Sequence, residues 1–222
     1  QPLKDVAVVA VSAGEGLNEI FQGLGADFVV TGGQTMNPST EDFLAAIEKV
    51  RAKEVILLPD NKNIILTAEQ AAKVAENAKV YVVPSRSIPQ GIAAMMSYNA
   101  EISGEENTEN MTEALGNVRS IEITHAVRDT SIEDKKIKEG QLLGIVDGKI
   151  KAVGDEMTEL IIQSLESIDI EDYELVTLYY GADVAEEDAE KIVDLLSEKY
   201  SEIEFELHFG GQAVYYYLLS VE

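Results

Sequence analysis

Hydroxyl and amide side chains gather in one short stretch of the sequence, at Thr35, Asn37 and Ser39. The stretch follows the apolar run 26–30, which predicts a buried strand, and then a pair of glycines that permits a tight turn. Ser39 stands where a helix N-cap is expected, with Asp42 three residues later. Because free backbone N–H groups at a helix N-terminus favour negative charge, the stretch predicts a site for an anionic group. An ordinary capped turn between a strand and a helix accounts for the same residues.

Two further groups of residues could take part in binding. Ser87 and Gly91 lie in a polar loop that follows an apolar segment and opens a helix. His208 stands just before Gly210 and Gly211, where the backbone can approach a ligand closely. A purely structural role for this histidine remains open at this stage.

Most kinds of catalytic site are disfavoured by the composition. The chain has no cysteine and only two histidines, His125 and His208, neither at metal-ligand spacing from another histidine. It has no phosphate-binding loop, no serine nucleophile elbow and no paired-histidine zinc motif. The sequence therefore predicts no catalytic residues, no metal and no cofactor, and nothing in it offers a nucleophile–base pair for an independent enzyme.

The first hundred residues predict the layer that must position these loops. Apolar segments at 5–12, 26–30, 54–58 and 79–83 alternate with helical patterns, which is typical of a parallel α/β sheet. Ligands of such sheets bind beyond the carboxyl ends of the strands. The loops that hold Thr35 to Ser39 and Ser87 to Gly91 both follow strands, so we expect them at that end.

The remainder of the chain predicts a second lobe of mixed α/β structure. A polar stretch at 99–110 suggests a boundary, which gives lobes of residues 1–100 and 101–222 in one two-lobed unit. Asp147-Gly148, between two short apolar segments, predicts a hairpin with a type I′ turn. Helices are expected at 157–168 and 184–200, and a closing strand at 213–221.

Acidic residues are concentrated in the second lobe. The formal charge is −24; residues 1–100 carry 11 acidic and 8 basic side chains, and residues 101–222 carry 30 and 9. Such a surface repels nucleic acid and anionic membranes, and it attracts a basic partner. Solubility alone is the other explanation of the excess acid. With no cysteine and no apolar run of membrane-spanning length, we expect a cytoplasmic protein, and the start at Gln1 suggests a fragment of a longer one.

The segment G-A-D-F-V-V-T-G-G-Q-T-M-N-P-S-T-E-D-F closely resembles the C-terminal domain of one family, the ATP-binding subunits of bacterial fatty acid kinase. These are dihydroxyacetone-kinase-like or YloV-type proteins. The segments P-S-R-S-I-P-Q-G and H-F-G-G-Q-A-V-Y-Y-Y-L-L-S-V-E fit the same family, so the resemblance spans essentially the whole chain. It implies a two-lobed DegV-like fold without the ATP-binding kinase domain.

The resemblance also implies a function. It suggests a non-catalytic domain that docks an acyl-loaded DegV-type fatty-acid-binding protein. The kinase domain of the same protein, joined through a middle domain, then phosphorylates the fatty acid to acyl phosphate for phospholipid synthesis in Gram-positive bacteria. The alternative is a small-molecule domain that itself binds a fatty acid or another carboxylate.

DegV-type carriers hold the fatty acid carboxylate with three segments, and the resemblance transfers these onto this chain. Thr35, Pro38 and Ser39 match a T-S-Q-P-S-like loop, and Ser87 and Gly91 match a serine-containing loop. His208, Gly210 and Gly211 match an H-x-G-P-G segment, although Gly211 stands in place of its proline. The resemblance thus implies one cleft between the lobes, and the departures favour a carrier fold reused as a docking module.

Overall fold

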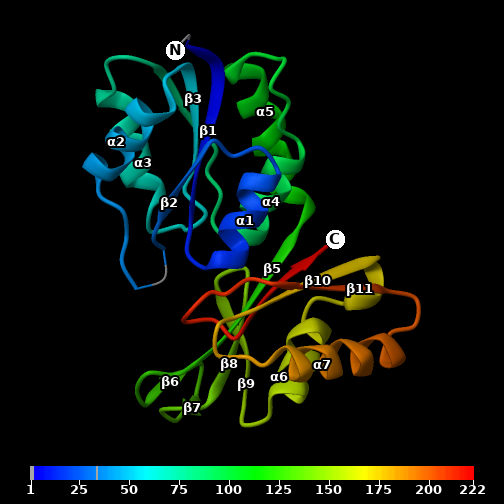
Figure 1. Cartoon of the computed structure of the whole chain (residues 1–222). Helices are drawn as coiled ribbons and strands as arrows, with labels where there is room; N and C mark the ends of the chain where they lie inside the picture. The colour runs from blue at the N-terminus through cyan, green and yellow to red at the C-terminus, as the bar shows by residue number, and fades with distance from the viewer. Residues whose placement is uncertain (1–2, 34) are drawn as a thin grey trace. The chain divides into compact units, whose positions relative to one another are not determined.

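The computed structural model describes residues 3–33 and 35–222 (Figure 1). The chain divides into two units, unit 1 up to Val118 and unit 2 from Arg119 to Glu222. Each unit has its own sheet and its own core, so each is described by itself.

Unit 1 is built on a four-stranded parallel sheet with the order β2-β1-β3-β4. Its strands are β1 (Lys4–Ser12), β2 (Phe28–Thr31), β3 (Ala52–Leu58) and β4 (Lys79–Val82). This confirms the predicted parallel α/β layer. The order places β2 on one side of β1 and β3 on the other, so the connections from β1 and β3 leave in opposite directions. The carboxyl ends of β1 and β3 therefore form a topological switch point, where such sheets bind ligands.

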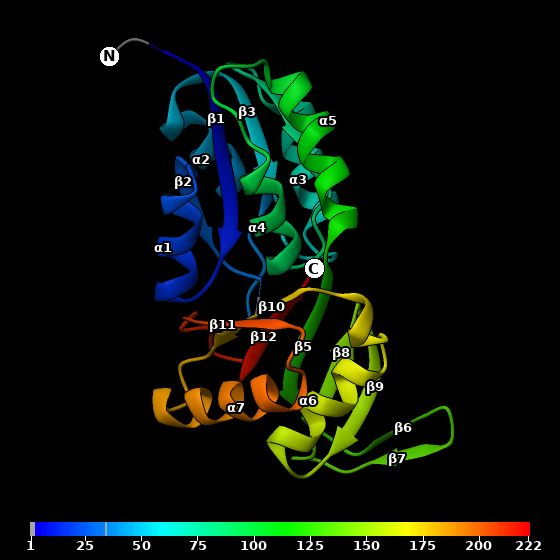
Figure 2. The same cartoon turned by 90° about the vertical axis from the view of Figure 1, so that its right-hand side faces the viewer.

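Five helices cover the two faces of this sheet. They are α1 (Glu15–Gly23), α2 (Thr40–Val50), α3 (Ile65–Val74), α4 (Ile88–Met96) and α5 (Gly104–Ala114), with a short 3₁₀ turn η1 (Leu115–Asn117) after the last. Helices α2 and α3 lie on one face, and α1, α4 and α5 on the other (Figures 1 and 2). Alternate residues of β1, such as Val9 and Val11, pack with Phe43 of α2 in one buried cluster.

Helix α5 occupies the stretch where sequence composition places a boundary. It begins after the N-cap Ser103, and the backbone N–H of Gly104 donates to Glu54 of β3 at 2.5 Å. Only one stripe of this helix is apolar or buried, including Met111, while its outer positions are acidic and exposed. A helix so poor in apolar residues has the composition of a linker. In the structure, unit 1 extends through this helix to Val118.

Unit 2 is built on a six-stranded mixed sheet with the order β11-β10-β12-β5-β8-β9. Its strands are β5 (Arg119–His125), β8 (Leu142–Val146), β9 (Lys149–Gly154), β10 (Leu175–Tyr180), β11 (Glu204–Phe209) and β12 (Tyr217–Val221). Strands β10 and β11 are parallel, and the other pairs are antiparallel. The predicted type I′ turn is confirmed, because Asp147 and Gly148 both have positive φ, 47° and 85°.

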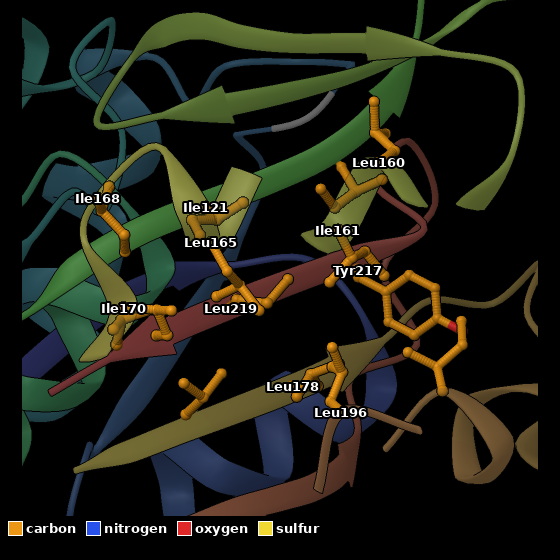
Figure 3. Packing of buried hydrophobic residues seen from close by; sticks show 14 of the residues in the cluster. Ile121, Leu160, Ile161, Leu165, Ile168, Ile170, Leu178, Leu196, Tyr217 and Leu219 are labelled. Atoms are coloured by element: carbon orange, nitrogen blue, oxygen red, sulfur yellow. The ribbon is translucent and has the colours of Figure 1, made fainter. Parts of the chain in front are cut away.

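Helices α6 (Met157–Glu166) and α7 (Glu186–Lys199) lie on the same face of this sheet (Figure 2). Their apolar stripes enclose the core of unit 2, where Tyr217 and Leu219 of β12 lie among Leu178 of β10 and Leu196 of α7 (Figure 3). A 3₁₀ turn, η2 (Ile170–Asp172), follows α6. A small hairpin of β6 (Thr130–Ile132) and β7 (Lys135–Ile137), which the sequence did not predict, extends from the sheet (Figure 2).

Candidate functional site

Three buried polar side chains follow the ends of the strands of unit 1. Ser12 ends β1, Asp60 follows β3, and Ser85 follows β4; their exposed fractions are 0%, 5% and 0%. The chain reaches Ser12 and Asp60 from the buried strands β1 and β3, and it reaches Ser85 from β4 through the buried Val83. Asp60 also lies in the left-handed region, with φ of 57°, so the chain turns sharply there. Helix α3 begins after this turn, at Ile65.

Two hydrogen bonds join Asp60 to Ser85. The backbone N–H of Asp60 donates to Ser85 Oγ at 2.9 Å, and the Ser85 hydroxyl donates to Asp60 Oδ1 at 2.7 Å. The hydroxyl oxygen is therefore held by one bond while its hydrogen is directed at the carboxyl by the other. This pair fixes the loops after β3 and β4 to one another.

The Asp60 carboxyl lies directly against the first turn of α4. A Cβ atom added to Gly91 would come within 2.1 Å of Asp60 Oδ1 and 2.5 Å of its Cγ. Only glycine at position 91 leaves room for this carboxyl.

Burial raises the pKa of Asp60 well above the ordinary value of an aspartate, and the Ser85 hydrogen bond offsets only part of that rise. Among the residues that the structure describes, neither Asp60 Oδ2 nor Ser12 Oγ has a hydrogen-bond partner. The switch point of unit 1 thus contains a carboxyl that burial favours in its neutral form, and two buried oxygens whose hydrogen-bonding capacity is unused.

The loop after β2 holds three of the predicted site residues, Thr35, Asn37 and Ser39. Thr35 and Asn37 are exposed, and Ser39 is the N-cap of α2. The Ser39 hydroxyl accepts from the backbone N–H of Asp42 at 3.1 Å, and the Asp42 carboxylate accepts from the Ser39 N–H at 2.9 Å. These bonds lower the pKa of Asp42. The ordinary capped turn therefore accounts for Ser39.

A side-chain bond connects this loop with the one after β3. Asn61 Nδ2 donates to the backbone oxygen of Gly33 at 2.8 Å. Together with the Asp60–Ser85 pair, it links the loops after β2, β3 and β4 at the carboxyl end of the sheet.

Ser87 and Gly91 lie at the start of α4, as predicted. Ser87 is the N-cap, and its hydroxyl accepts from the backbone N–H of Gln90 at 3.2 Å. Gly91 lies in the first turns of the helix, against Asp60. The hydroxyl of Ser87 thus serves the helix, while the buried hydroxyl beside the carboxyl belongs to Ser85.

The third predicted group lies in unit 2, at and after the end of β11. His208 is half exposed; its Nε2 lies 3.5 Å from a carboxylate oxygen of Glu206, and its ring stacks on that of Tyr179. Gly210 lies against the side chain of Gln212, whose Oε1 would be 2.0 Å from an added Cβ. Gly211 has φ of 72°.

The buried side chain of Gln212 stabilises this turn of unit 2. It is fully buried and donates from Nε2 to the backbone oxygen of Tyr179 at 2.9 Å. Its Oε1 has no partner within the described part of the chain. The glycine at 210 is therefore required by the packing of Gln212.

Four of these residues are not among those predicted from the sequence: Ser12, Asp60, Ser85 and Gln212. A signal for the first three exists, since each is a small polar residue that ends or follows an apolar strand at the carboxyl edge. No such signal marks Gln212, because its burial depends on strands far apart in the sequence.

Residues 3–33 and 35–222 contain no cluster of three or more histidine, aspartate or glutamate side chains suited to a metal ion. In the same residues, no helix has the length and apolar character needed to cross a membrane.

Comparison with known proteins identifies relatives along almost the whole chain. The family model for the C-terminal region of FakA-like fatty acid kinase proteins matches residues 7–222. Protein YloV of Bacillus subtilis (strain 168) is 43% identical over 215 residues, which are 97% of this chain and 39% of that protein. An uncharacterised protein of Staphylococcus aureus (strain USA300) is 39% identical over 218 residues, 98% of this chain and 40% of that one. The chain therefore spans about two fifths of the length of these relatives.

Solved structures show the same fold at low sequence identity. A DegV family protein of Corynebacterium glutamicum has a TM-score of 0.67 at 17% identity, over 98% of this chain and 96% of that one. DegV of Bacillus subtilis, titled a fatty acid binding protein, has a TM-score of 0.62 at 15% identity, over 99% of this chain and all of that one. The DegV-like fold expected from the sequence is confirmed.

Proposed function

The chain belongs to the FakA-like C-terminal family of fatty acid kinase proteins, and from this premise we propose that it is a docking domain without catalytic activity of its own. It binds an acyl-loaded DegV-type fatty-acid-binding protein. It thereby brings the fatty acid carboxylate to the kinase domain of the same cytoplasmic protein, which makes the acyl phosphate.

The observation that carries this proposal is the acidic outer surface of α7. Its inner stripe, which includes Leu196, is buried, while Glu186, Glu187, Asp188, Glu190, Asp194 and Glu198 are all exposed. Leu195, on the same helix, is 51% exposed, and its exposed neighbours at helical spacing are Lys191, Glu198 and Lys199. An exposed apolar side chain on a helix rich in carboxylates is complementary to a partner with a small apolar contact and basic groups.

The state of the predicted site residues supports docking over carrying. The hydroxyls of Ser39 and Ser87 are used as helix N-caps, and His208 is stacked on Tyr179. Hydroxyls that already accept from the backbone have less capacity to hold a ligand carboxylate. A domain with the carrier fold but with these groups engaged is well suited to a role in recognition.

The test is a calorimetric titration of the chain with an acyl-loaded DegV-type carrier at low and high salt. We expect binding that weakens as salt rises, because the acidic surface attracts its partner through exposed charges. The triple substitution Glu187→Gln, Asp194→Asn and Glu198→Gln on α7 should weaken binding and flatten its salt dependence.

A matched control removes three carboxylates from unit 1 instead: Glu48→Gln, Glu69→Gln and Glu76→Gln. It changes the net charge by the same amount and should leave binding close to that of the unaltered chain. Equal loss in both triple variants would show that only net charge matters, and absence of binding at either salt would rule out docking by this domain.

The alternative function is binding of a fatty acid or another carboxylate, and the fold of DegV of Bacillus subtilis is what favours it. The candidate residues from the sequence are Thr35, Asn37, Ser39, Ser87 and Gly91 in unit 1, and His208, Gly210 and Gly211 in unit 2. This function predicts a carboxylic acid released from the purified chain on denaturation and identified by mass spectrometry. A clean extract, together with no binding of added fatty acid, excludes it.

A further inference from the structure

Strand β11 lies at one end of the sheet of unit 2, and within the described residues it pairs with one strand, β10. The backbone N–H groups of Glu204 and Gly210 both donate to carbonyls on the β10 side. Because successive residues of a strand direct their backbone groups to opposite sides, Phe205, Leu207 and Phe209 direct theirs to the open edge. An edge of this kind is a template for a further strand.

The strand at the other end of this sheet, β9, is protected from such pairing. It carries two exposed lysines, Lys149 and Lys151, and its ladder with β8 has a register shift between Gly144 and Ile145. Lysines and bulges are features that keep edge strands from pairing with other chains. Strand β11 contains no lysine and no proline, and its ladder with β10 keeps one register over six residue pairs. Of the two end strands, β11 is therefore the one suited to accept another strand.

The sequence of β11 is complementary to itself when two copies run antiparallel. With Leu207 opposite Leu207 of a second copy, Phe205 lies opposite Phe209, and Glu206 lies opposite His208. The three residues with open backbone groups then face one another, as the hydrogen-bonded pairs of an antiparallel ladder require. A register centred on Glu206 would place two carboxylates opposite each other, and one centred on His208 would leave Glu206 opposite a glycine. Charge therefore selects the register centred on Leu207.

The side chains that would meet across the two copies are accessible. Those of Glu206 and His208 are 46% and 51% exposed, and Phe209 is 43% exposed. The ring of Phe209 already contacts that of Tyr180, with centroids 5.3 Å apart, and Phe205 of the second copy would extend this pair into an aromatic row. Pairing therefore covers an exposed apolar side chain and gives each imidazole a second carboxylate neighbour.

We propose that β11 is a self-association edge, at which two copies of this chain pair through antiparallel β11 strands about a two-fold axis at Leu207. The two sheets of unit 2 then become one continuous sheet. The contact uses the same surface on both copies, so it closes as a dimer and does not grow into a fibre. Because strands of six residues form a small contact, the dimer is weak and forms at high protein concentration. The inference concerns unit 2 alone and holds whether or not the domain docks a carrier.

Helix α7 gives this dimer a distinct dependence on salt. The helix packs on the face of the sheet lined by Phe205 and Leu207, so the two-fold axis brings the α7 of the second copy onto the same face. Both helices are acidic on their exposed surfaces, and each copy has a formal charge of −24, so repulsion opposes pairing. Salt screens this repulsion. Self-association should therefore strengthen as salt rises, whereas carrier docking should weaken.

The first test is sedimentation velocity of the unaltered chain over a range of concentrations, at low and high salt. We expect a monomer that gives way to a dimer as concentration rises, at lower concentration in high salt. A monomer at every concentration up to the solubility limit overturns the proposal, and so does growth beyond the dimer. Neither result bears on carrier docking, which is measured in a separate titration.

A charge exchange tests the register. Glu206→Lys places a lysine opposite His208, and His208→Glu places two glutamates opposite each other, so each variant alone should dimerise roughly tenfold more weakly. An equimolar mixture of the two variants restores opposite charges at both pairs, and so does the double variant Glu206→Lys/His208→Glu. Both should recover the dimer. Failure of both to recover it overturns the proposal.

The matched control for the charge exchange is Glu139→Lys, which makes the same change at an exposed residue of unit 2 outside β11. It should not weaken the dimer. Weakening equal to that of Glu206→Lys would show that net charge and not the β11 edge governs association, which also overturns the proposal.

Disulfide trapping tests the two-fold axis, because the chain has no cysteine of its own. In Leu207→Cys the two Cα atoms would lie about 5.5 Å apart, within the range of a disulfide. In the control Phe205→Cys the two positions are four residues out of register, roughly 13 Å apart along the strands. Oxidation with copper phenanthroline should give a covalent dimer of the first variant and little of the second. Equal trapping of both variants overturns the proposal.

If Leu207→Cys does not fold, the exposed pair replaces it. Glu206→Cys and His208→Cys, mixed in equal amounts, should be trapped with each other faster than either is trapped with itself, since the two positions lie opposite one another. Trapping without that preference contradicts the proposed register and overturns the proposal.

Discussion

At the scale of single residues, the burial of Asp60 makes stability depend on pH. Its pKa is raised in the folded state, so the folded chain retains a proton that the unfolded chain has already lost as pH rises above the ordinary aspartate value. Stability therefore falls with rising pH until the raised pKa is passed. An asparagine side chain does not titrate, so Asp60→Asn should gain stability relative to the unaltered chain over this range, by up to about 1.4 kcal/mol per pH unit.

Urea unfolding at a series of pH values measures this difference. Asp134→Asn is the control, because it makes the same chemical change at an exposed residue of positive φ, and its curve should run parallel to that of the unaltered chain. A parallel curve for Asp60→Asn as well would show that Asp60 ionises normally in the folded protein.

The sequence predicts the role of some of these residues and not of others. Ser39 and Ser87 were identifiable as N-caps, because capping depends on neighbours within three residues. The sequence marks Asp60 only as a polar residue after a strand, because its burial depends on Ser85 and Gly91, which are brought to it when β3 and β4 pair. Short sequence patterns predict contacts between neighbouring residues, whereas the switch point is formed by residues that are far apart in the sequence.

Among the elements, β12 is a central, fully buried strand of unit 2, since it lies between β10 and β5. Leu219→Ala removes a side chain that is fully buried in the core and should destabilise the chain by roughly 2–5 kcal/mol. Leu195→Ala, the same change on the exposed surface of α7, should alter stability by no more than about 0.5 kcal/mol while weakening docking. Urea unfolding of both variants checks the contrast, and comparable losses would contradict the assignment of β12 to the core.

Helices and strands are predictable from the sequence where the apolar periodicity or the turn residues are distinct. The four strand–helix alternations of unit 1 and the Asp-Gly hairpin of unit 2 follow from apolar periodicity and turn chemistry. The residues of α5 resemble a linker between lobes in the sequence, because the exposed positions of this helix are acidic and its buried stripe is narrow. The β6–β7 hairpin has strands of three residues in which only Ile137 is buried, so it lacks an apolar pattern.

At the scale of the molecule, the uneven charge makes the two units respond differently to salt. Residues 119–222 carry 25 acidic and 9 basic side chains, and residues 1–118 carry 16 and 8. Self-repulsion within unit 2 is the larger and is screened by salt, so added sodium chloride should stabilise unit 2 more than unit 1. Hydrogen exchange resolved by peptide should therefore slow more in residues 119–222, and an equal change in both units would argue against this account.

The order of the strands in unit 2 has a consequence for how the protein is made. Residues 217–221 form a central strand, so until they have been synthesised the strands β10 and β11 cannot be joined to β5, β8 and β9 in one sheet. Unit 1 needs no residue beyond 118 and can complete its sheet while the ribosome is still extending the chain. Unit 2 can close only after β12 has emerged, and until then the apolar edges that β12 will cover are available to chaperones and to other nascent chains.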